Sequence, residues 1–257
     1  MKKNKPIVGF FGISGCAGCL LSFLYEEVFL KITKKVDIRS FPLIKEDNYK
    51  GNFDFVFIEG TVVFEKDISL LNELRRRAKY VIALGSCSCF GGVPSIRNFK
   101  DGEKKIKFVY PKYDFLKSVK PSPIDKYIKV DFYIPQCPPN KKEIIDFLNC
   151  ILTEKPFRLK EEPVCVECRK NGNRCLLEDN ILCLGPLTLG GCNAICPQNK
   201  TGCYGCRGPF KEANYNSFIH LLKKKKYTKK EIEERMEIFA GLNFKKEEEK
   251  ISKWLEQ

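Results

Sequence analysis

The sequence has little histidine, no nucleotide-binding fingerprint and no internal repeat. His220 is the only histidine among 257 residues. It lies in the helical pattern Ser217–Leu222, where we expect a surface or packing residue and not a ligand. Gly12, Gly15 and Gly18 are spaced three apart, which does not match G-x-G-x-x-G. This spacing excludes the dinucleotide-binding interpretation.

The chain also lacks a convincing leader or membrane segment. The uncharged stretch from Pro6 to Tyr25 follows several lysines, as the apolar part of a signal peptide would. However, three glycines interrupt it, it has no small-residue cleavage pattern, and two glutamates end it. It divides naturally into a strand over Ile7–Phe11, a glycine-rich turn and the start of a helix, which also argues against a bilayer-spanning helix. We therefore expect a cytoplasmic protein, whose thiols stay reduced and can bind metal.

Negative charge is in the minority, since the net charge is +14. Nucleic-acid binding is one interpretation of this excess, and docking of a basic face on an acidic partner is another. Because the lysines are interspersed with glutamates, a solvated surface is the simpler explanation. Hydrophobic residues make up 43% of the chain, enough for a sizeable core. The length suits one large domain, or one with a small appendage.

Short apolar runs alternate with helical patterns up to residue 153. Such alternation predicts a parallel sheet with helices on both sides. The expected strands are Ile7–Phe11, Val36–Phe41, Phe53–Glu59, Tyr80–Leu84 and Val130–Ile134. The expected helices are Leu20–Lys34, Phe64–Ala78 and Asn140–Leu152.

The rest of the chain shows weaker patterns. Residues 94–128 are rich in proline and charge, which predicts a long surface excursion. Residues 157–212 have no sustained periodicity, and the tail from Ala213 is helical. Thr228 and Glu231 form a capping box, and Gly241 is a plausible end for the helix that follows. The predicted domains are 1–156, 157–212 and 213–257.

Cysteine is abundant and unevenly placed. Eight of the 14 cysteines lie between Cys165 and Cys206, and none follows them. The others include four on turns that follow predicted strands: Cys16, Cys19, Cys87 and Cys137. Because the carboxyl ends of parallel strands face one crevice, these four should converge. Four thiolates on glycine- and proline-rich turns suit one 4Fe–4S cluster. Cys89 competes with Cys87 by proximity, and Cys150 is expected in the core.

The eight later cysteines divide into two sets of four. The sets are Cys165, Cys168, Cys175 and Cys183, then Cys192, Cys196, Cys203 and Cys206. Zinc competes here, since paired C-x2-C motifs bind it tetrahedrally. Neighbouring glycine and proline favour iron–sulfur clusters. A swapped partition, in which one cysteine serves the other cluster, stays open.

These motifs resemble a known family. The segments Gly15–Cys19, Ile58–Gly60, Gly85–Cys87 and Cys137–Pro139 resemble the small subunit of nickel–iron hydrogenases, and the cluster-bearing subunit of respiratory complex I shares parts of the pattern. Later segments resemble the delta subunit of cytoplasmic sulfhydrogenases, which are heterotetrameric and NAD(P)-linked. These segments are Pro163–Cys168, Cys183–Thr188, Gly191–Pro197 and Cys203–Gly208.

The resemblance implies three 4Fe–4S clusters. The proximal cluster would take Cys16, Cys19, Cys87 and Cys137; the medial would take Cys192, Cys196, Cys203 and Cys206; the distal would take Cys165, Cys168, Cys175 and Cys183. Cys165 stands where many hydrogenases have histidine. Cys196 stands where those with a 3Fe–4S medial centre have proline. The implied fold class is α/β: a flavodoxin-like doubly wound parallel sheet, an irregular cluster domain and a helical tail.

The resemblance also implies a role without bond-breaking chemistry. The chain lacks the two distant C-x-x-C pairs that hold nickel and iron in large subunits. It would relay electrons between a nickel–iron large subunit and flavin- or iron–sulfur-containing subunits that react with NAD(P), with no catalytic residue of its own and no nucleic acid or membrane partner. The rivals are the small subunit of a methanogen-type hydrogenase linked to heterodisulfide reductase and a zinc-dependent nucleic-acid-binding protein.

Overall fold

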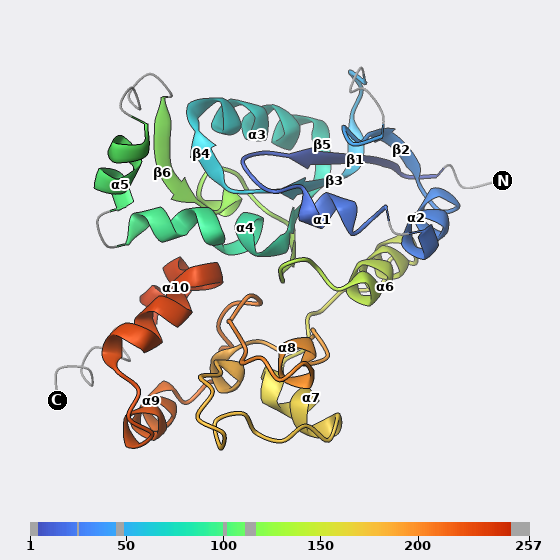
Figure 1. Ribbon diagram of the computed structural model, residues 1–257. Helices are drawn as coiled ribbons and strands as arrows, with labels where there is room; N and C mark the ends of the chain where they lie inside the picture. The colour runs from blue at the N-terminus through green and yellow to red at the C-terminus, as the bar shows by residue number, and fades with distance from the viewer. Residues whose placement is uncertain (1–4, 25, 45–48, 100–101, 111–116, 248–257) are drawn as a thin grey trace. The chain divides into compact units, whose positions relative to one another are not determined.

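A computed structural model describes residues 5–24, 26–44, 49–99, 102–110 and 117–247 (Figure 1). It divides into two compact units, Met1–Phe157 and Arg158–Gln257. The first boundary lies one residue from the expected end of the first domain. The division into domains 1–156, 157–212 and 213–257 stays a prediction.

The first unit is built on a five-stranded parallel sheet. Its spatial order is β2-β1-β3-β5-β7, and every neighbouring pair is parallel. The strands are β1 (Ile7–Gly12), β2 (Asp37–Ser40), β3 (Phe53–Glu59), β5 (Ala78–Leu84) and β7 (Phe132–Ile134). Counting only these strands, the order is 2-1-3-4-5, that of the flavodoxin-like fold. The predicted α/β class is therefore confirmed.

Helices cover both faces of this sheet (Figure 1). They are α1 (Gly18–Leu21), α2 (Glu26–Thr33), α3 (Glu65–Arg77), α4 (Gly85–Phe90) and α6 (Lys141–Leu152). One core contains Phe10, Phe57 and Phe147, and the Phe10 and Phe57 rings stack with centroids 5.0 Å apart. The other core contains Leu71 and Leu74 of α3. Two apolar faces explain why the central strands read as continuous apolar runs.

The predicted helix over Leu20–Lys34 is two helices in the structure. The first, α1, ends at Leu21, and α2 begins at Glu26. The Phe23 and Leu24 amides donate to Leu20 and Leu21 carbonyls in a turn between them. Phe23 is 1% exposed, so its side chain is packed in the core at this break. Periodicity alone missed the break because apolar residues continue through it.

The surface excursion predicted over residues 94–128 contains regular elements that the sequence did not indicate, in the part that the structure describes. This region contains η1 (Val93–Asn98), α5 (Gly102–Val109), β6 (Ser118–Ser122) and η3 (Ile124–Lys126). Strand β6 pairs antiparallel with β4 (Val62–Phe64). A short strand that contains a lysine and a proline has little intrinsic strand preference, so its pairing partner decides its conformation.

The second unit combines an irregular cysteine-rich part with a helical tail. Its elements are α7 (Val164–Lys170), η4 (Gly185–Leu187), α8 (Ile195–Gln198), α9 (Tyr215–Lys224) and α10 (Lys229–Lys246). The predicted capping box is confirmed, since the Glu231 amide donates to Thr228 Oγ1 (3.2 Å) and the Thr228 amide to Glu231 Oε2 (2.7 Å).

The sequence had predicted that Gly241 ends the helix after Thr228, and the structure has a kink between two helical segments at the residue before it. Helix α10 continues to Lys246, although the backbone at Ala240 is non-helical (φ −134°, ψ 31°). Phe244 is 2% exposed, so its burial holds the turns beyond the kink in place. Among the residues that the structure describes, no helix is both long enough and apolar enough to cross a bilayer.

Candidate iron–sulfur sites

Four thiols meet where the parallel strands of the first unit end. Cys16 and Cys19 follow β1, Cys87 lies in α4 directly after β5, and Cys137 follows β7. Burial raises the pKa of the Cys19 thiol, and the charges of Glu59, Cys137, Cys87 and Cys16 raise it further. Only groups that lie close together in a poorly solvated space influence each other in this way. The structure therefore brings together the four cysteines that the sequence had placed at one edge.

Two glycines lie so close to these thiols that a side chain at either position would collide with sulfur. Gly85 has φ +83°, and a Cβ added there would lie 2.3 Å from Cys19 Sγ. A Cβ on Gly92 would lie 2.4 Å from Cys87 Sγ. Glycine thus lets the main chain approach sulfur closely, as thiolates that share a cluster require. This cradle fits the iron–sulfur group that the sequence predicts.

Glu59 supports the loop that carries the first two thiols. Its carboxylate is 3% exposed, and Oε2 accepts the amide hydrogens of Cys19 (3.1 Å) and Leu20 (3.4 Å). Burial raises the pKa of Glu59, although these backbone hydrogen bonds oppose the rise. Asp67, which the sequence did not single out, accepts from Ser14 Oγ (3.0 Å) and from the amide of Phe64 (2.9 Å). Both carboxylates therefore hold the loop in place.

The first predicted cysteine set of the second unit also comes together. Cys165 and Cys168 lie on α7, and Cys175 and Cys183 follow on irregular chain. Burial raises the pKa of Cys165 to about 12, with further contributions from Cys183, Cys168 and Cys175. A Cβ on Gly185 would lie 3.1 Å from Cys165 Sγ and 3.5 Å from Cys183 Sγ. Here too glycine makes room for sulfur.

The second predicted set shows interactions within two pairs of its cysteines, and not among all four. Burial raises the pKa of Cys192, and Cys196 is among the further causes; burial likewise raises that of Cys203, with Cys183 and Cys206 contributing. The Cys203 amide donates to Cys183 Sγ (3.2 Å), which links the two sets. The assignment of Cys192, Cys196, Cys203 and Cys206 to one cluster stays a prediction. Within the described residues, no three His, Cys, Asp or Glu side chains are arranged to hold a single metal ion.

The remaining candidates lie elsewhere. Cys89 is 2% exposed and belongs to the core that contains Leu71; its thiol donates to the Ala83 carbonyl (3.5 Å). Cys150 on α6 is half-buried, and His220 on α9 is exposed. The structure therefore separates Cys89 from Cys87, although both lie in α4.

Two buried charges beside the later cysteines were missed in the sequence. Glu167 lies between Cys165 and Cys168, and Arg207 directly follows Cys206. They are 3% and 1% exposed. The sequence shows that each charged residue lies inside or next to a cysteine motif, but it does not show that the side chain is buried.

Comparison with known proteins gives the class. Residues 16–151 match the family model described as NADH ubiquinone oxidoreductase, 20 Kd subunit. Sulfhydrogenase 2 subunit delta of Pyrococcus furiosus is 35% identical over 84% of this chain and 92% of its own. One subunit of the F420-non-reducing hydrogenase vhu from Methanocaldococcus jannaschii is 32% identical over 78% of this chain and 81% of its own.

Solved structures agree. A chain of an NAD+-reducing [NiFe]-hydrogenase in its H2-reduced state superposes with a TM-score of 0.55 at 25% identity, covering 61% of this chain and 96% of that chain. A chain of the [NiFeSe] hydrogenase from Desulfovibrio vulgaris Hildenborough has a TM-score of 0.59 at 18% identity, covering 82% and 96%, and shows the fold alone.

A flavodoxin-like sheet with four thiols at its carboxyl edge, joined to a cysteine-rich unit, defines an oxidoreductase subunit of the iron–sulfur type. The chain belongs to the hydrogenase small-subunit family, which includes the matched 20 Kd subunit model. Membership and 14 cysteines together imply iron–sulfur clusters. Small subunits of this family pair with a large subunit in hydrogenase complexes. Family membership thus favours iron–sulfur over the zinc interpretation.

The raised thiol pKa values predict how the iron-free protein reacts. The Cys137 residue is exposed at the surface, but partial burial of its thiol, with Cys87 and Cys16 adding to the effect, raises its pKa to about 11. Its thiolate should therefore appear only at high pH, and alkylation by iodoacetamide should speed up about tenfold per pH unit from pH 7 to 10. The folded iron-free state should also lose stability as the pH rises from about 8.5 towards 11, because the unfolded thiol ionises first.

Mass spectrometry of alkylated peptides measures this rate. The same protein in guanidinium is the control, since its rate should level off above about pH 8.5. If the folded protein levelled off at that pH too, the proposed crowding of thiols in the iron-free state would be wrong.

Proposed function

We propose that the chain is the electron-transfer subunit of a cytoplasmic, NAD(P)-linked nickel–iron hydrogenase or sulfhydrogenase. It would carry electrons between the nickel–iron site of a large subunit and partner subunits that contain flavin and iron–sulfur centres. The observation that carries the proposal is the convergence of Cys16, Cys19, Cys87 and Cys137 at one edge of the sheet. The 35% identity to a sulfhydrogenase delta subunit over 92% of that protein supports the partner class.

Twelve cysteines would hold three 4Fe–4S clusters, which supply one-electron transfer when bound. The proximal set is Cys16, Cys19, Cys87 and Cys137; the medial set is Cys192, Cys196, Cys203 and Cys206; the distal set is Cys165, Cys168, Cys175 and Cys183. Cys19, Cys183 and Cys203 are buried, so the chain itself shields these sulfurs from water. The amide of Gly205 also donates to Cys203 Sγ (3.5 Å), and such hydrogen bonds raise the reduction potential of a cluster.

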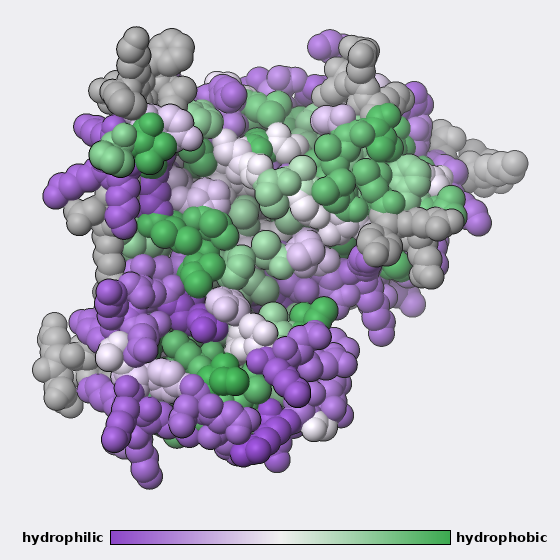
Figure 2. Space-filling view, viewed as in Figure 1, coloured by the Kyte–Doolittle hydropathy of each residue, from purple (hydrophilic) through white to green (hydrophobic). Residues whose placement is uncertain are grey.

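The surface beside the first site suits a partner. Leu21, two residues after Cys19, is 52% exposed, and Val93, directly after Gly92, is 47% exposed. Figure 2 shows apolar surface on the viewed face of the first unit. Contiguous exposed apolar surface, unlike single exposed apolar side chains, commonly marks protein–protein contacts. We infer that the large subunit covers this surface, and that the chain contributes no catalytic residue to hydrogen cleavage.

One rival has support of its own. The 32% identity to a subunit of an F420-non-reducing hydrogenase favours the small subunit of a methanogen-type hydrogenase linked to heterodisulfide reductase. Both proposals place the chain beside a nickel–iron large subunit. They differ in the subunits that exchange electrons with it.

Anaerobic purification of the tagged chain from its native cells tests the proposal. We expect a nickel-containing large subunit and a flavoprotein to co-purify, with about twelve irons in this chain. Co-purification with heterodisulfide reductase subunits would favour the rival. A chain that holds about four irons would remove both assignments in the second unit, and one that holds zinc without iron would overturn the proposed function.

A further inference from the structure

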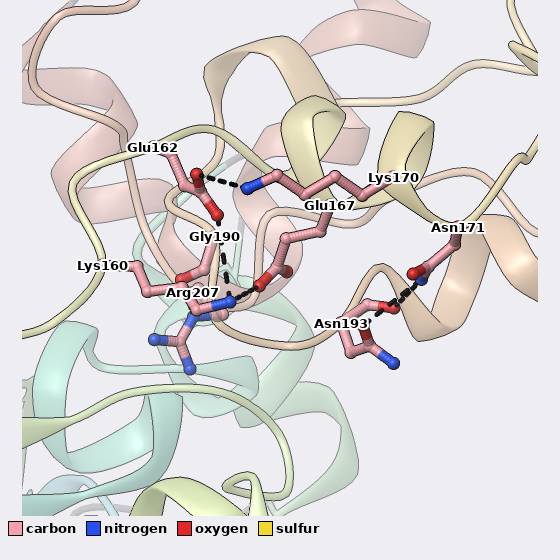
Figure 3. A network of polar contacts seen from close by, with 8 residues as sticks. All are labelled: Lys160, Glu162, Glu167, Lys170, Asn171, Gly190, Asn193 and Arg207. Carbon is pink, nitrogen blue, oxygen red and sulfur yellow. Dashed lines mark hydrogen bonds and ion pairs between the residues drawn. The ribbon is translucent and has the colours of Figure 1, made fainter.

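Charged side chains are buried around the loop that carries Cys192. Arg207 is 1% exposed and Glu167 is 3% exposed. Lys160 Nζ lies 2.5 Å from Glu167 Oε1, and Figure 3 shows this pair within a wider polar network. Residues this deeply buried are seldom charged unless a partner or a function compensates for the lost hydration. Packing alone would be served as well by apolar side chains of similar volume.

The guanidinium of Arg207 lies against the backbone directly before Cys192. Its Nε donates to the Gly190 carbonyl at 2.6 Å. A Cβ on Gly191 would lie 2.3 Å from Nη2 of Arg207, so only glycine leaves room for this contact. A guanidinium keeps its proton at every working pH. The chain therefore fixes a permanent positive charge next to one of the predicted ligands.

Glu167 provides the opposite charge from the other side. It lies on α7 between Cys165 and Cys168. Burial by itself raises the pKa of Glu167, but the Lys160 ammonium and the backbone of Gly191 and Asn193 together outweigh this effect, and the pKa is lowered. The 2.5 Å contact between Glu167 Oε1 and Lys160 Nζ is that of an ion pair, so Glu167 carries a negative charge. Its partner Lys160 is 56% exposed, so water and salt screen the lysine more than they screen the buried carboxylate.

Both charges influence Cys192. Arg207 donates to the Gly190 carbonyl, two residues before Cys192, and Glu167 accepts from the backbone of Gly191 and Asn193, on either side of Cys192. The effects have opposite signs because a negative neighbour disfavours a thiolate and a positive one favours it. A reduced cluster carries one more negative charge than an oxidised one. The same two side chains must therefore act on reduction in opposite directions.

The polar network also holds these charges at fixed positions. Asn171, at the end of α7, donates through Nδ2 to the Asn193 carbonyl at 2.9 Å. Lys170 Nζ lies 3.3 Å from Glu162 Oε2, and Lys160 Nζ lies 3.8 Å from Glu162 Oε1 (Figure 3). These contacts tie α7 to the Cys192 loop and to the segment before α7. A charge held rigidly in a poorly solvated place acts more strongly than a mobile one in water.

We propose that Arg207 and Glu167 set the reduction potential of the cluster held by Cys192, Cys196, Cys203 and Cys206, Arg207 raising it and Glu167 lowering it. The proposal rests on the proposed function, because it needs a cluster at these cysteines. Arg207 and Glu167 are positioning residues for charge and take no part in bond breaking. Cluster potentials depend on nearby charge, on hydrogen bonds to sulfur and on exposure to solvent, and here the chain adds buried charge to the hydrogen bond and the shielding at Cys203.

An anaerobic redox titration of the complex, followed by electron paramagnetic resonance, tests the pair. In Arg207→Gln, we expect the equilibrium constant for one-electron reduction of one cluster to fall about tenfold, a shift of about 59 mV to lower potential. In Glu167→Gln, the same cluster should shift to higher potential, since the lost charge is negative. Loosened packing would not shift the reduction potential in opposite directions in the two variants.

Arg169→Gln is the matched control. Arg169 also neighbours a predicted ligand, since it lowers the pKa of Cys165 against the larger effect of burial, but it is exposed. Solvent screening should keep its effect small, and the cluster that responds to Arg207 should not respond to it.

The outcomes separate the two proposals. A wild-type complex without cluster signals would overturn the proposed function and this inference together. Three normal wild-type signals with unshifted potentials in both variants, or with shifts of the same sign, would overturn this inference alone. If Arg207→Gln does not retain its clusters, the nearly isosteric Glu167→Gln decides: a shift to higher potential supports the inference, and an unchanged or lower potential refutes it.

Discussion

Alanine in place of Cys87 should remove about four of about twelve irons from the purified chain, whereas alanine in place of Cys89 should remove none. The two residues lie in the same short helix, α4. The Cys87 thiol lies close enough to Cys16 for their charges to interact. The Cys89 thiol belongs instead to the core and donates to the Ala83 carbonyl. Position in the fold, and not distance along the chain, should decide which one binds iron.

Iron assay and electron paramagnetic resonance of anaerobically purified variants measure this difference. Cys89→Ala is the control for packing, since it deletes one buried sulfur and should cost about 1 kcal/mol of stability. In Cys87→Ala the signals of the two clusters in the second unit should persist. Iron loss from Cys89→Ala with full iron in Cys87→Ala would reverse the ligand assignment.

Removal of iron should unfold the cysteine-rich part of the second unit while the first unit stays folded. The first unit has two apolar cores that contain residues such as Phe57 and Leu71. In the second unit the segment from Leu182 to Arg207 contains only η4 and α8, both of four residues or fewer. Such short elements cannot hold a fold by their own hydrogen bonds. Metal–thiolate bonds must supply the missing stability, as in other small metal-dependent modules.

Hydrogen exchange monitored by mass spectrometry gives the measurement. After anaerobic chelation, amides between Leu182 and Arg207 should exchange about a hundredfold faster. Peptides of β3 and β5 should keep their protection and serve as the internal control. Rebinding of iron and sulfide should restore the original rates. Equal loss of protection in both units, or no loss in either, would contradict the claim that apolar cores stabilise the first unit and metal–thiolate bonds stabilise the second.

The strands of the first unit could be predicted because each buried strand is itself a run of apolar residues. Phe53–Glu59 was predicted as a strand and is β3 with the same bounds. A strand covered on both faces needs an apolar run, which is visible without knowledge of its neighbours. Strand β6 was missed because Ser118–Ser122 has no such run and depends on β4 for its pairing.

The convergence of the first four thiols could be predicted for a different reason. A parallel sheet sends every strand end to the same edge, so the positions of Cys19, Cys87 and Cys137 after strands were sufficient. No comparable rule governs irregular chain. The assignment of the eight later cysteines as metal ligands stays a prediction, and the sequence did not predict how neighbouring charges would be buried among them.

The order of apolar runs determined the α/β class by itself, and the cysteine motifs carried the resemblance to the hydrogenase small-subunit family and, through it, to iron–sulfur proteins. Only the tertiary structure decided that Cys89 points into a core, that a second helical segment follows the kink at Ala240, and that Arg207 and Glu167 lie buried beside Cys192. The physical reason is that periodicity is a property of adjacent residues. The burial of a charge or a thiol depends on segments that are distant along the chain, and it becomes defined only when they pack together.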